Sequence, residues 1–294
     1  MLNHTEIDGD GVSTDGQLPI SVVICTLDEQ DNIRDCILAI QNNRPAEIIV
    51  VDGGSTDRTV EYAKQFPIRV LETVKGLGHQ TQVGIECTSQ NYIALIHADD
   101  RCAERCFETL LHEMQESGYW AIKARTLSWE PRTYWEKAMD LNLRLFLNKV
   151  GPTNMVGRPA MFRKEAFKFV KNDALFTFSG EDADLSRQME LAGLPQGHGS
   201  GIVYRKHLAS LAPCFQQWKR YGEGDGRFVY KYPSRIPHML FHLLINYPLL
   251  KSLRVARLGN ARYCGFFLMQ GSVRMIWAVK EYLSLIFSRK VHQS

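Results

Sequence analysis

Short apolar runs alternate with amphipathic stretches along the first two thirds of the chain. Between the runs, apolar residues recur at helical spacing, for example at Ile33, Cys36, Ile37 and Ile40. Runs that are apolar throughout are typical of strands buried on both faces of a parallel sheet. The pattern therefore predicts an α/β fold, with strands near residues 20–26, 47–52, 68–72, 92–97 and 119–126, a helix near 133–149 and a further strand at 159–163.

The last third combines apolar segments with strong positive charge. From Val203 to the end there are 15 Lys and Arg residues against 3 Asp and Glu, although the net charge of the whole chain is only +3. The segments 239–250 and 263–287 are interrupted by Pro248 and Arg274, so neither gives the roughly 18 uninterrupted apolar residues of a spanning helix. We expect amphipathic helices lying on an anionic membrane surface. The alternative is that they pack on the α/β domain or on a second subunit.

Three regions are expected along the 294 residues: a flexible leader at 1–17, an α/β domain at 18–230 and an amphipathic helical region at 231–294. The leader lacks the basic and apolar segments of a secretory signal peptide. Seven cysteines without zinc-site spacing are typical of free thiols in a reducing compartment. We therefore expect a cytoplasmic protein, peripheral at the inner face of the cell membrane. No nucleic-acid partner is expected, because no reader motif accompanies the basic residues.

The strand near 47–52 ends in Asp52-Gly53-Gly54-Ser55-Thr56-Asp57. Ligands of open α/β sheets bind at the carboxyl ends of the strands. The glycines allow a tight turn, and Ser55 is expected to cap a helix whose first turn holds Asp57. The Asp52 carboxylate suits N–H or O–H donors of a base or ribose, whereas a phosphate site would need several backbone N–H groups and a lysine. The alternative is an ordinary turn in which Asp52 and Ser55 act only as caps.

Three more polar clusters are expected to lie near this edge. Two of them follow predicted strands, and the third begins a predicted helix. Side chains alternate along a strand, so His97 and Asp99 can share one face. The positive end of a helix dipole favours ionised carboxylates in the third cluster. The clusters are Thr26-Leu27-Asp28-Glu29, His97-Ala98-Asp99 and Glu181-Asp182.

Taken in order, the four clusters resemble the motifs of family 2 glycosyltransferases, inverting sugar-nucleotide enzymes that include transferases for bacterial exopolysaccharides and cell-surface glycans. The resemblance runs from about Ser21 to about Gly226. Asp28 stands where the family usually has Asn, and His97 stands at the first Asp of the family's Asp-x-Asp metal motif. The resemblance implies a GT-A (Rossmann-like nucleotide-diphospho-sugar transferase) domain, followed by a helical, basic C-terminal appendage.

The resemblance also implies roles outside these clusters. Lys75 and Gln80 lie in a loop similar to the family's Gly-Arg-x-x-Gln segment, with Leu77 in place of the Arg; a plain glycine-rich turn is the alternative. His207 resembles a His near the metal and diphosphate, the alternative being a surface histidine in a basic run. The implied nucleotide-binding residues are Thr26, Asp28, Glu29, Asp52, Gly53, Lys75, Gln80 and Asp99, and the implied acceptor- or diphosphate-binding residues are Arg205, Gln217, Arg220 and Tyr221.

The implied reaction moves a sugar from a nucleoside diphosphate sugar, expected to be UDP-linked, to a hydroxyl of a glycan or lipid-linked acceptor. A divalent cation, Mn²⁺ or Mg²⁺, held by Asp99, His97 and His207 would neutralise the departing diphosphate. Imidazole is a poor ligand for Mg²⁺, so His97 favours Mn²⁺. Asp182 would take the acceptor's proton as general base, with Glu181 beside it, in a single inverting displacement.

Two other classes of protein compete with this reading. A nucleotide-sugar-binding or scaffold protein with a degenerate metal motif is favoured by His97 and disfavoured by the intact Asp52, Asp99 and Asp182. A nucleotidyltransferase of similar architecture would need a Gly-rich phosphate loop after the first strand, and residues 26–31 lack one. The resemblance therefore implies a metal-assisted, inverting glycosyltransferase.

Overall fold

The computed structural model describes residues 16–176 and 179–291, so most of the expected leader at 1–17 lies outside the described residues. The described chain divides into two compact units. We call the first the sheet unit; it holds the chain from residue 16 to Trp129, Leu143–Ala174 and Asp182–Lys206. We call the second the helical unit; it holds Glu130–Asn142, the described part of Leu175–Glu181 and the described chain from His207 onward.

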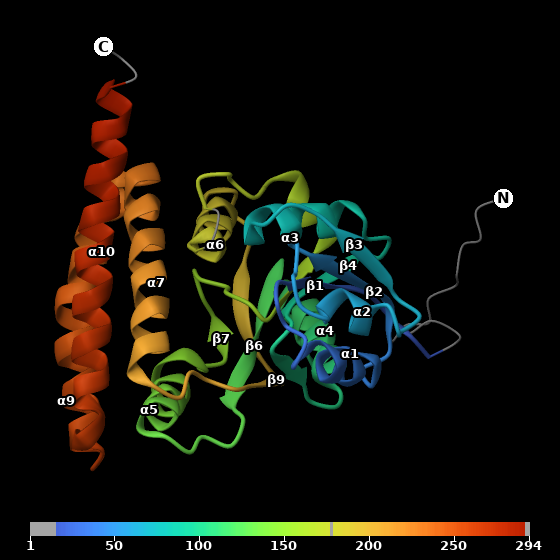
Figure 1. Cartoon of the computed structure of the whole chain (residues 1–294), viewed down its shortest axis with the longest axis horizontal. Helices are drawn as coiled ribbons and strands as arrows, with labels where there is room; N and C mark the ends of the chain where they lie inside the picture. Colours follow the sequence, from blue (N-terminus) through green and yellow to red (C-terminus); the bar gives the residue numbers. More distant parts are fainter. Residues whose placement is uncertain (1–15, 177–178, 292–294) are drawn as a thin grey trace. The chain divides into compact units, whose positions relative to one another are not determined.

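A mixed sheet forms the framework of the sheet unit (Figure 1). Its strand order is β3-β2-β1-β4-β8-β6-β9-β5, and β7 pairs with β9. β1 to β4 are parallel as predicted, whereas β8 is antiparallel to both β4 and β6. All the predicted strands are confirmed. The strands are β1 (Leu18–Thr26), β2 (Pro45–Asp52), β3 (Arg69–Glu72), β4 (Tyr92–His97), β5 (Asp100–Cys102), β6 (Ala121–Ser128), β7 (Gly151–Pro152), β8 (Ala160–Arg163) and β9 (Gln196–Arg205).

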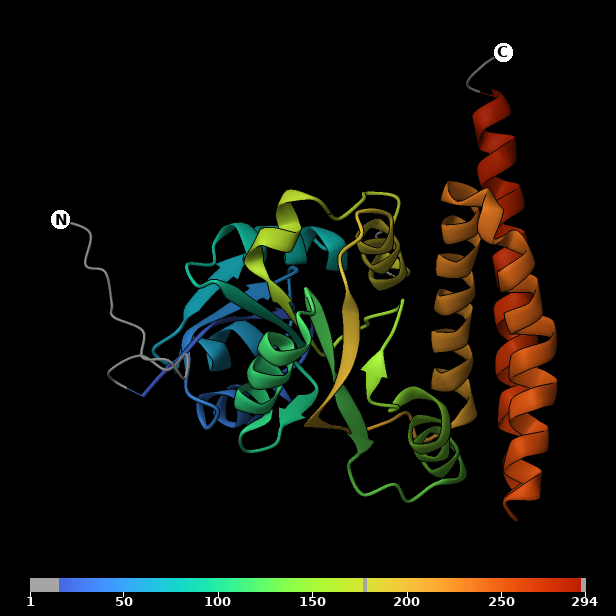
Figure 2. The same ribbon diagram turned by 180° about the vertical axis from the view of Figure 1, so that it is seen from behind.

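β9 was not predicted from the sequence, because a glycine stands at every second position from Gly197 to Gly201 and interrupts the apolar pattern of a strand. A Cβ on Gly199 or Gly201 would lie 2.7 or 2.8 Å from the Leu110 side chain. Leu110 belongs to α4 (Cys106–Ser117), which covers β9 and β6 (Figure 2). The missing side chains therefore let this helix pack directly on the strand.

The two faces of the sheet carry separate apolar cores. Alternate residues of β1 point to opposite faces. Ile24 packs with Ile37 on one face, and Val23 packs with Ile85 and Met189 on the other. The helices of the sheet unit besides α4 are α1 (Ile33–Gln41), α2 (Thr59–Ala63), α3 (Leu77–Glu86), α6 (Glu181–Leu191), a π-helical turn (Leu143–Leu147) and a 3₁₀ turn (Lys164–Lys168).

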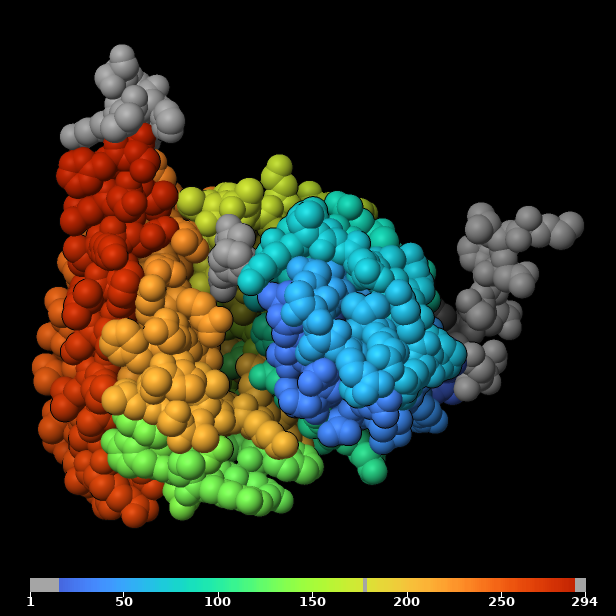
Figure 3. Space-filling view, viewed as in Figure 1, coloured from blue at the N-terminus to red at the C-terminus, as the bar shows by residue number. Residues whose placement is uncertain are grey.

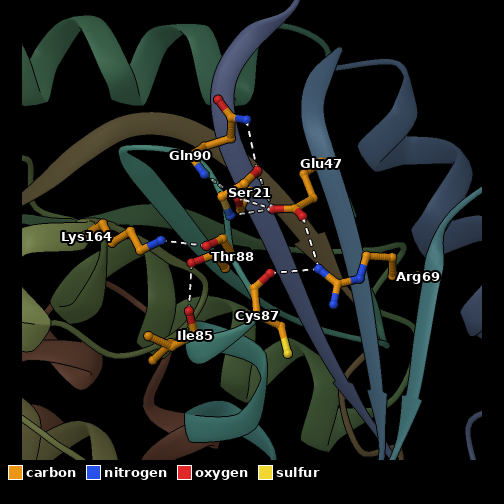
Figure 4. A network of polar contacts seen from close by, with 9 residues as sticks. Ser21, Glu47, Arg69, Ile85, Cys87, Thr88, Gln90 and Lys164 are labelled. Atoms are coloured by element: carbon orange, nitrogen blue, oxygen red, sulfur yellow. Dashed lines mark hydrogen bonds and ion pairs between the residues drawn. The ribbon is translucent and has the colours of Figure 1, made fainter. Parts of the chain in front are cut away.

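A polar network fastens the amino ends of the strands (Figure 4). The Ser21 hydroxyl donates to the Glu47 carboxylate at 2.5 Å, and the Ser89 N–H donates to the same carboxylate at 2.9 Å. Arg69 donates to the Cys87 carbonyl at 2.8 Å. These bonds fix the edge of the sheet that lies opposite the predicted ligand-binding loops.

In the helical unit, α7 (Leu211–Lys231) lies along α10 (Cys264–Val291) (Figure 3). A Cβ on Gly222 or Gly226 would lie 2.5 Å from a carbonyl oxygen of α10, so these glycines let the two backbones approach closely. α7 belongs to the helical unit. The other helices are α5 (Tyr134–Asn142), α8 (Ile236–Phe241), a π-helix (His242–Lys251), α9 (Ser252–Arg257) and 3₁₀ turns at Pro233–Arg235 and Ala261–Tyr263.

A partly buried ion pair joins three segments of the helical unit. Arg274 of α10 binds both carboxylate oxygens of Asp225 in α7 at 2.8 Å, and it donates to the Tyr247 hydroxyl of the π-helix at 3.2 Å. The apolar segments predicted to be helical are confirmed as helices. Within residues 16–176 and 179–291, no helix combines the length and apolar character needed to cross a membrane.

Gly222→Ala should lower the free energy of unfolding by about 1–3 kcal/mol, because the methyl group overpacks an interface of backbone atoms. Gly265→Ala in α10 is the matched control, since its Cβ would meet only the Tyr134 hydroxyl at 3.5 Å. Alanine stabilises a helix by about 1 kcal/mol relative to glycine, so the control should be neutral or stabilised. Denaturant unfolding measures both, and equal stability of the two variants would contradict the close approach of α7 to α10.

Candidate active site

The loops that follow β1 and β2 are joined by hydrogen bonds at the carboxyl edge of the sheet. Asp28 Oδ1 accepts the Thr56 N–H at 2.8 Å, and the Asp28 N–H donates to Ser55 Oγ at 2.8 Å. The Glu29 N–H donates to Thr59 Oγ1 at 2.7 Å. Asp28 has a φ of +55°, which Asp and Asn tolerate better than most residues. The two loops therefore form one continuous rim, which we call the double-loop rim (residues 27–32 and 53–59).

Asp52 is buried, at 1% exposure, and its carboxylate serves its own loop. Oδ2 accepts the N–H groups of Gly54 and Ser55, both at 2.8 Å, and Oδ1 accepts a bond from Ser55 Oγ. The expectation that Ser55 caps a helix is wrong, because α2 begins at Thr59, whose N–H donates to Asp57 Oδ1 at 2.9 Å. The contacts of Asp52 are therefore those of a residue that shapes its own turn, which is the alternative stated from the sequence.

Gln80 lies buried between the ends of β1 and β2. Its Nε2 donates to the carbonyls of Thr26 and Val51, both at 2.9 Å. A Cβ on Gly53 would lie 2.9 Å from the Gln80 amide, so the glycine leaves the space that Gln80 fills. Lys75, in the loop before α3, is exposed. Gln80 and Gly53 thus hold the strand ends together beneath the rim.

β4 delivers His97 and Asp99 to the same edge. His97 stands opposite Cys25 of β1 in the parallel register. Burial, together with the charges of Arg205 and Arg158, holds the pKa of His97 well below its ordinary value, so the imidazole is neutral at pH 7. The Asp99 side chain is 36% exposed, and its Oδ1 lies 3.6 Å from the Nε of Arg205. A neutral imidazole and an accessible carboxylate therefore lie at the end of this strand.

Asp100 is a buried acid that the sequence analysis did not single out. It accepts two bonds from Arg205, at 2.7 and 2.9 Å, and one from the His97 N–H at 3.0 Å. Burial raises the pKa of Asp100 to about 6, with Arg205 opposing the shift and Asp99 adding to it, so the group is mainly ionised at pH 7. Arg205, which the sequence assigned to the acceptor or diphosphate, is thus anchored on Asp100 beside Asp99.

Asp182, the predicted base, is held by Arg158. The backbone N–H of Arg158 donates to Asp182 Oδ2 at 3.2 Å. The side-chain Nε of Arg158 lies 3.6 Å from Asp182 Oδ1. The Arg158 side chain is 1% exposed, whereas that of Asp182 is 26% exposed. Arg158 also donates to Thr81 Oγ1 at 2.7 Å and to Cys25 Sγ at 3.9 Å. This guanidinium, which the sequence analysis missed, therefore links α6 to the carboxyl end of β1.

Lys123 is a second basic residue that the sequence analysis missed. On β6 it stands opposite Ala160 of β8 and His198 of β9. Burial, followed by the charge of Arg205, lowers the pKa of Lys123 to about 8, while Asp182 and Asp100 act to raise it. Lys123 therefore lies within electrostatic range of both the predicted base and the acidic end of β4.

The remaining predicted residues belong to the helical unit. Glu181 is buried, His207 and Gln217 are partly buried, and Arg220 and Tyr221 are exposed. The predicted residues that the sheet unit alone brings to its carboxyl edge are Thr26, Asp28, Glu29, Asp52, Gly53, Gln80, His97, Asp99, Asp182 and Arg205.

The described residues contain no group of three or more His, Cys, Asp and Glu side chains arranged to hold a metal ion. The sheet unit offers the Asp99 carboxylate and the neutral imidazole of His97. Protein sites for Mg²⁺ often use only one or two carboxylates together with substrate phosphates. This donor set therefore fits a cation that arrives with a diphosphate better than one held by protein ligands alone.

Comparison with known proteins identifies the family, because residues 21–171 match Glycosyl transferase family 2. The chain belongs to this family of glycosyltransferases. The lipopolysaccharide core biosynthesis glycosyltransferase LpsC of Rhizobium meliloti (strain 1021) is 35% identical over 104 residues, 33% of this chain and 37% of LpsC. A glycosyltransferase of Haemophilus influenzae, itself uncharacterised, is 26% identical over 214 residues, 64% of this chain and 65% of that protein.

The fold of the glycosyltransferase is also found in solved structures. The structure of GalNAc-T7 with UDP, GalNAc and Mn²⁺ matches it with a TM-score of 0.53 at 14% identity, over 66% of this chain and 44% of that one. The α/β fold with GT-A-like neighbours and a helical C-terminal region is therefore confirmed. Several curated relatives are matched over only about a third of their length.

Lys123→Met should make the protein more stable and less active. Removing a buried ammonium should raise the free energy of unfolding by roughly 0.5–2 kcal/mol. The gain in the free energy of unfolding should be full below pH 8 and should shrink as the pH rises toward 10.5. In that range Lys123 of the folded protein loses its proton, so the wild type no longer buries a charge. Lys64→Met, at an exposed ion pair, is the control and should change neither quantity.

Denaturant unfolding at pH 7 and pH 10 measures the stability of both variants, and release of nucleoside diphosphate from a nucleotide sugar measures their activity. A Lys123→Met variant that is less stable than the wild type, or fully active, would contradict the assignment of Lys123 to the site.

Proposed function

We propose that the glycosyltransferase moves a sugar from a UDP-linked donor to a hydroxyl of a glycan or lipid-linked acceptor, with inversion at the anomeric carbon. The observation that carries this proposal is the contact of Asp182 with the buried Arg158 at the end of β1. A general base must be held in one geometry and still reach its substrate. Asp182 meets both conditions, since its partner is almost fully buried and its own carboxylate is partly exposed.

The donor's nucleoside is proposed to bind at the double-loop rim. Asp28 is exposed and Glu29 is partly exposed, so their carboxylates can accept bonds from ribose hydroxyls or a base N–H. In this proposal Thr26, Asp52, Gly53 and Gln80 act by shaping the rim, through the contacts described above. Lys75 is proposed to contact the diphosphate, because its ammonium is exposed and a phosphate is its natural partner.

A divalent cation, when bound, would neutralise charge on the departing diphosphate. Asp99 and His97 of the sheet unit are proposed to hold it. Arg205 orients Asp99, since its Nε lies 3.6 Å from that carboxylate while Asp100 holds the guanidinium through two hydrogen bonds. The imidazole nitrogen favours Mn²⁺ over Mg²⁺, and the Mn²⁺ in the structure of GalNAc-T7 supports this choice.

The acceptor hydroxyl is proposed to lose its proton to Asp182 as it attacks the anomeric carbon. Arg158 binds the carboxylate from its buried side, so that its exposed side remains for the acceptor. The name of LpsC supports a cell-surface glycan as the acceptor.

The helical unit is proposed to lie on the cytoplasmic face of an anionic membrane. Among the described residues, 13 of the 24 large hydrophobic side chains that are exposed lie between Leu240 and Phe287, so this region concentrates apolar surface. Arg254, Arg257, Arg262 and Lys280 are exposed in the same region. Apolar side chains flanked by cations are typical of helices that insert into the boundary of an anionic bilayer.

Asp182→Asn should lower turnover by about a hundredfold or more while leaving donor affinity intact, because general base assistance is typically worth that much. Release of UDP from UDP-glucose, UDP-galactose and UDP-N-acetylglucosamine measures turnover, and calorimetric titration with UDP measures binding. Glu190→Gln on the same helix is the control and should keep both values. Normal turnover of Asp182→Asn would remove it as the base, and UDP binding without turnover in the wild type would favour a nucleotide-sugar-binding protein.

The full-length protein should bind vesicles of phosphatidylglycerol and phosphatidylcholine more tightly than phosphatidylcholine alone, and salt should weaken this binding because it screens the basic residues. Cosedimentation measures it. Leu249→Gln combined with Leu253→Gln should reduce binding by about a hundredfold or more, since each apolar side chain contributes about 1.5 kcal/mol or more when buried, about tenfold in affinity. Leu191→Gln, at an exposed leucine of α6, is the control. Equal affinity for neutral and anionic vesicles would contradict the proposal.

A further inference from the structure

A groove runs beside α1 in the sheet unit, and it meets the double-loop rim at Asn32. It encloses about 390 Å³, which is within the range of small-molecule sites. One wall is α1, from Asn32 to Asn42, and the other is formed by β5 and the ends of β6 and β9. Ten residues of helix rise about 15 Å, so the groove has the length of two or three sugar rings. We call it the α1–β5 groove.

The far wall of the groove presents two aromatic rings. Trp129 follows β6 and is 45% exposed, and Tyr204 of β9 packs edge-on against it with ring centroids 5.6 Å apart. An exposed tryptophan on the wall of a cavity is apolar area available to a ligand. The indole N–H and the phenol hydroxyl add hydrogen-bonding groups to the same wall.

The charged groups of the groove are nearly balanced in sign. Asp35, Asp99 and Glu104 line it together with Arg101 and Lys206, and Arg101 already pairs with Asp35 at 3.2 Å. Such a lining would repel or poorly neutralise a polyanion, so neither a phosphate group nor a nucleic acid fits it. A neutral ligand with an apolar face and many hydroxyl groups fits both the rings and the carboxylates.

The groove shares one residue with the proposed reaction centre. Asp99 lines its end and also contacts Arg205, which is anchored on Asp100. A ligand lying along α1 can therefore extend to the carboxyl end of β4. Donor and acceptor of a glycosyl transfer must meet at such a point.

We propose that the α1–β5 groove binds the carbohydrate chain of the acceptor, with a sugar ring against Trp129 and Tyr204. This rests on the proposed function, because it assigns the groove to the acceptor of that reaction. The Asp35 carboxylate and the amides of Asn32 and Asn42 bind sugar hydroxyls, and the rings select a saccharide over a simple alcohol. The groove thus sets which glycan is extended, while the double-loop rim sets the nucleotide.

Indole N–H signals of the full-length protein, labelled with ¹⁵N-tryptophan, test this directly. Methyl β-glucoside, methyl β-galactoside, lactose and maltotriose are added in turn, and the Trp129 and Trp120 signals are identified with Trp129→Phe and Trp120→Phe. At least one sugar should move the Trp129 signal and leave the Trp120 signal, which reports on a ring packed against Phe169. No movement of Trp129 with any of the four sugars, or equal movement of both signals, overturns the proposal.

Variants give a second measurement. Tyr204→Ala should weaken the binding of that sugar at least tenfold and leave the hydrolysis of UDP-glucose by water unchanged. Phe169→Ala, which removes an exposed aromatic ring elsewhere in the sheet unit, should change neither. Unchanged sugar affinity in Tyr204→Ala overturns the assignment of the groove.

The same samples separate the groove from the proposed function. If the protein hydrolyses the donor but no sugar moves the Trp129 signal, the assignment of the groove to the acceptor is wrong and the proposed glycosyl transfer is unaffected. Sugar binding at Trp129 in a chain that neither binds UDP nor hydrolyses a UDP-sugar supports a carbohydrate groove and removes the proposed reaction. Movement of the Trp129 signal by UDP alone assigns the groove to the donor and overturns its role for the acceptor.

Discussion

The common register of β1, β2 and β4 is the constraint on which the candidate site depends. Thr26 stands opposite Asp52, and Cys25 stands opposite His97, so three loops leave the sheet at one level. Gln80 bonds the carbonyls at the ends of β1 and β2 and maintains that register from inside. The hydrogen bonds that make the double-loop rim require this alignment, because each joins residues nearly thirty positions apart along the chain.

Buried charges beneath this edge set the positions of the reactive groups. Arg158 fixes Asp182, and Asp100 fixes Arg205 beside Asp99. Breaking such a pair typically costs about 3–5 kcal/mol, whereas replacing both partners by apolar groups is often harmless. A fold that needed only stability would not require them. Their presence at the ligand-binding edge of the sheet is consistent with the part we propose for these residues in the reaction.

The features that could be predicted from the sequence are local ones. Strands such as β2 carry apolar runs, and their polar ends mark the ligand-binding edge, so the α/β fold and the strand-end residues follow from pattern and resemblance. β9 was missed because its glycines are required by the packing of α4, which lies about ninety residues earlier in the chain. Arg158 and the pairing of Asp100 with Arg205 were missed for the same reason, since only the folded sheet brings residues more than a hundred positions apart into contact. Lys123 was missed because its charged neighbours also come from other elements. The turn role of Asp52, by contrast, was already among the alternatives.

The anomeric configuration of the released sugar tests the central claim, a single displacement, most directly. The wild-type enzyme is incubated with whichever of UDP-glucose, UDP-galactose and UDP-N-acetylglucosamine it hydrolyses fastest, all of which are α-linked. Proton NMR then follows the anomeric signals before mutarotation mixes them. Water attacking from the face opposite UDP should release the β-anomer first. Release of the α-anomer first would show retention and would contradict the account.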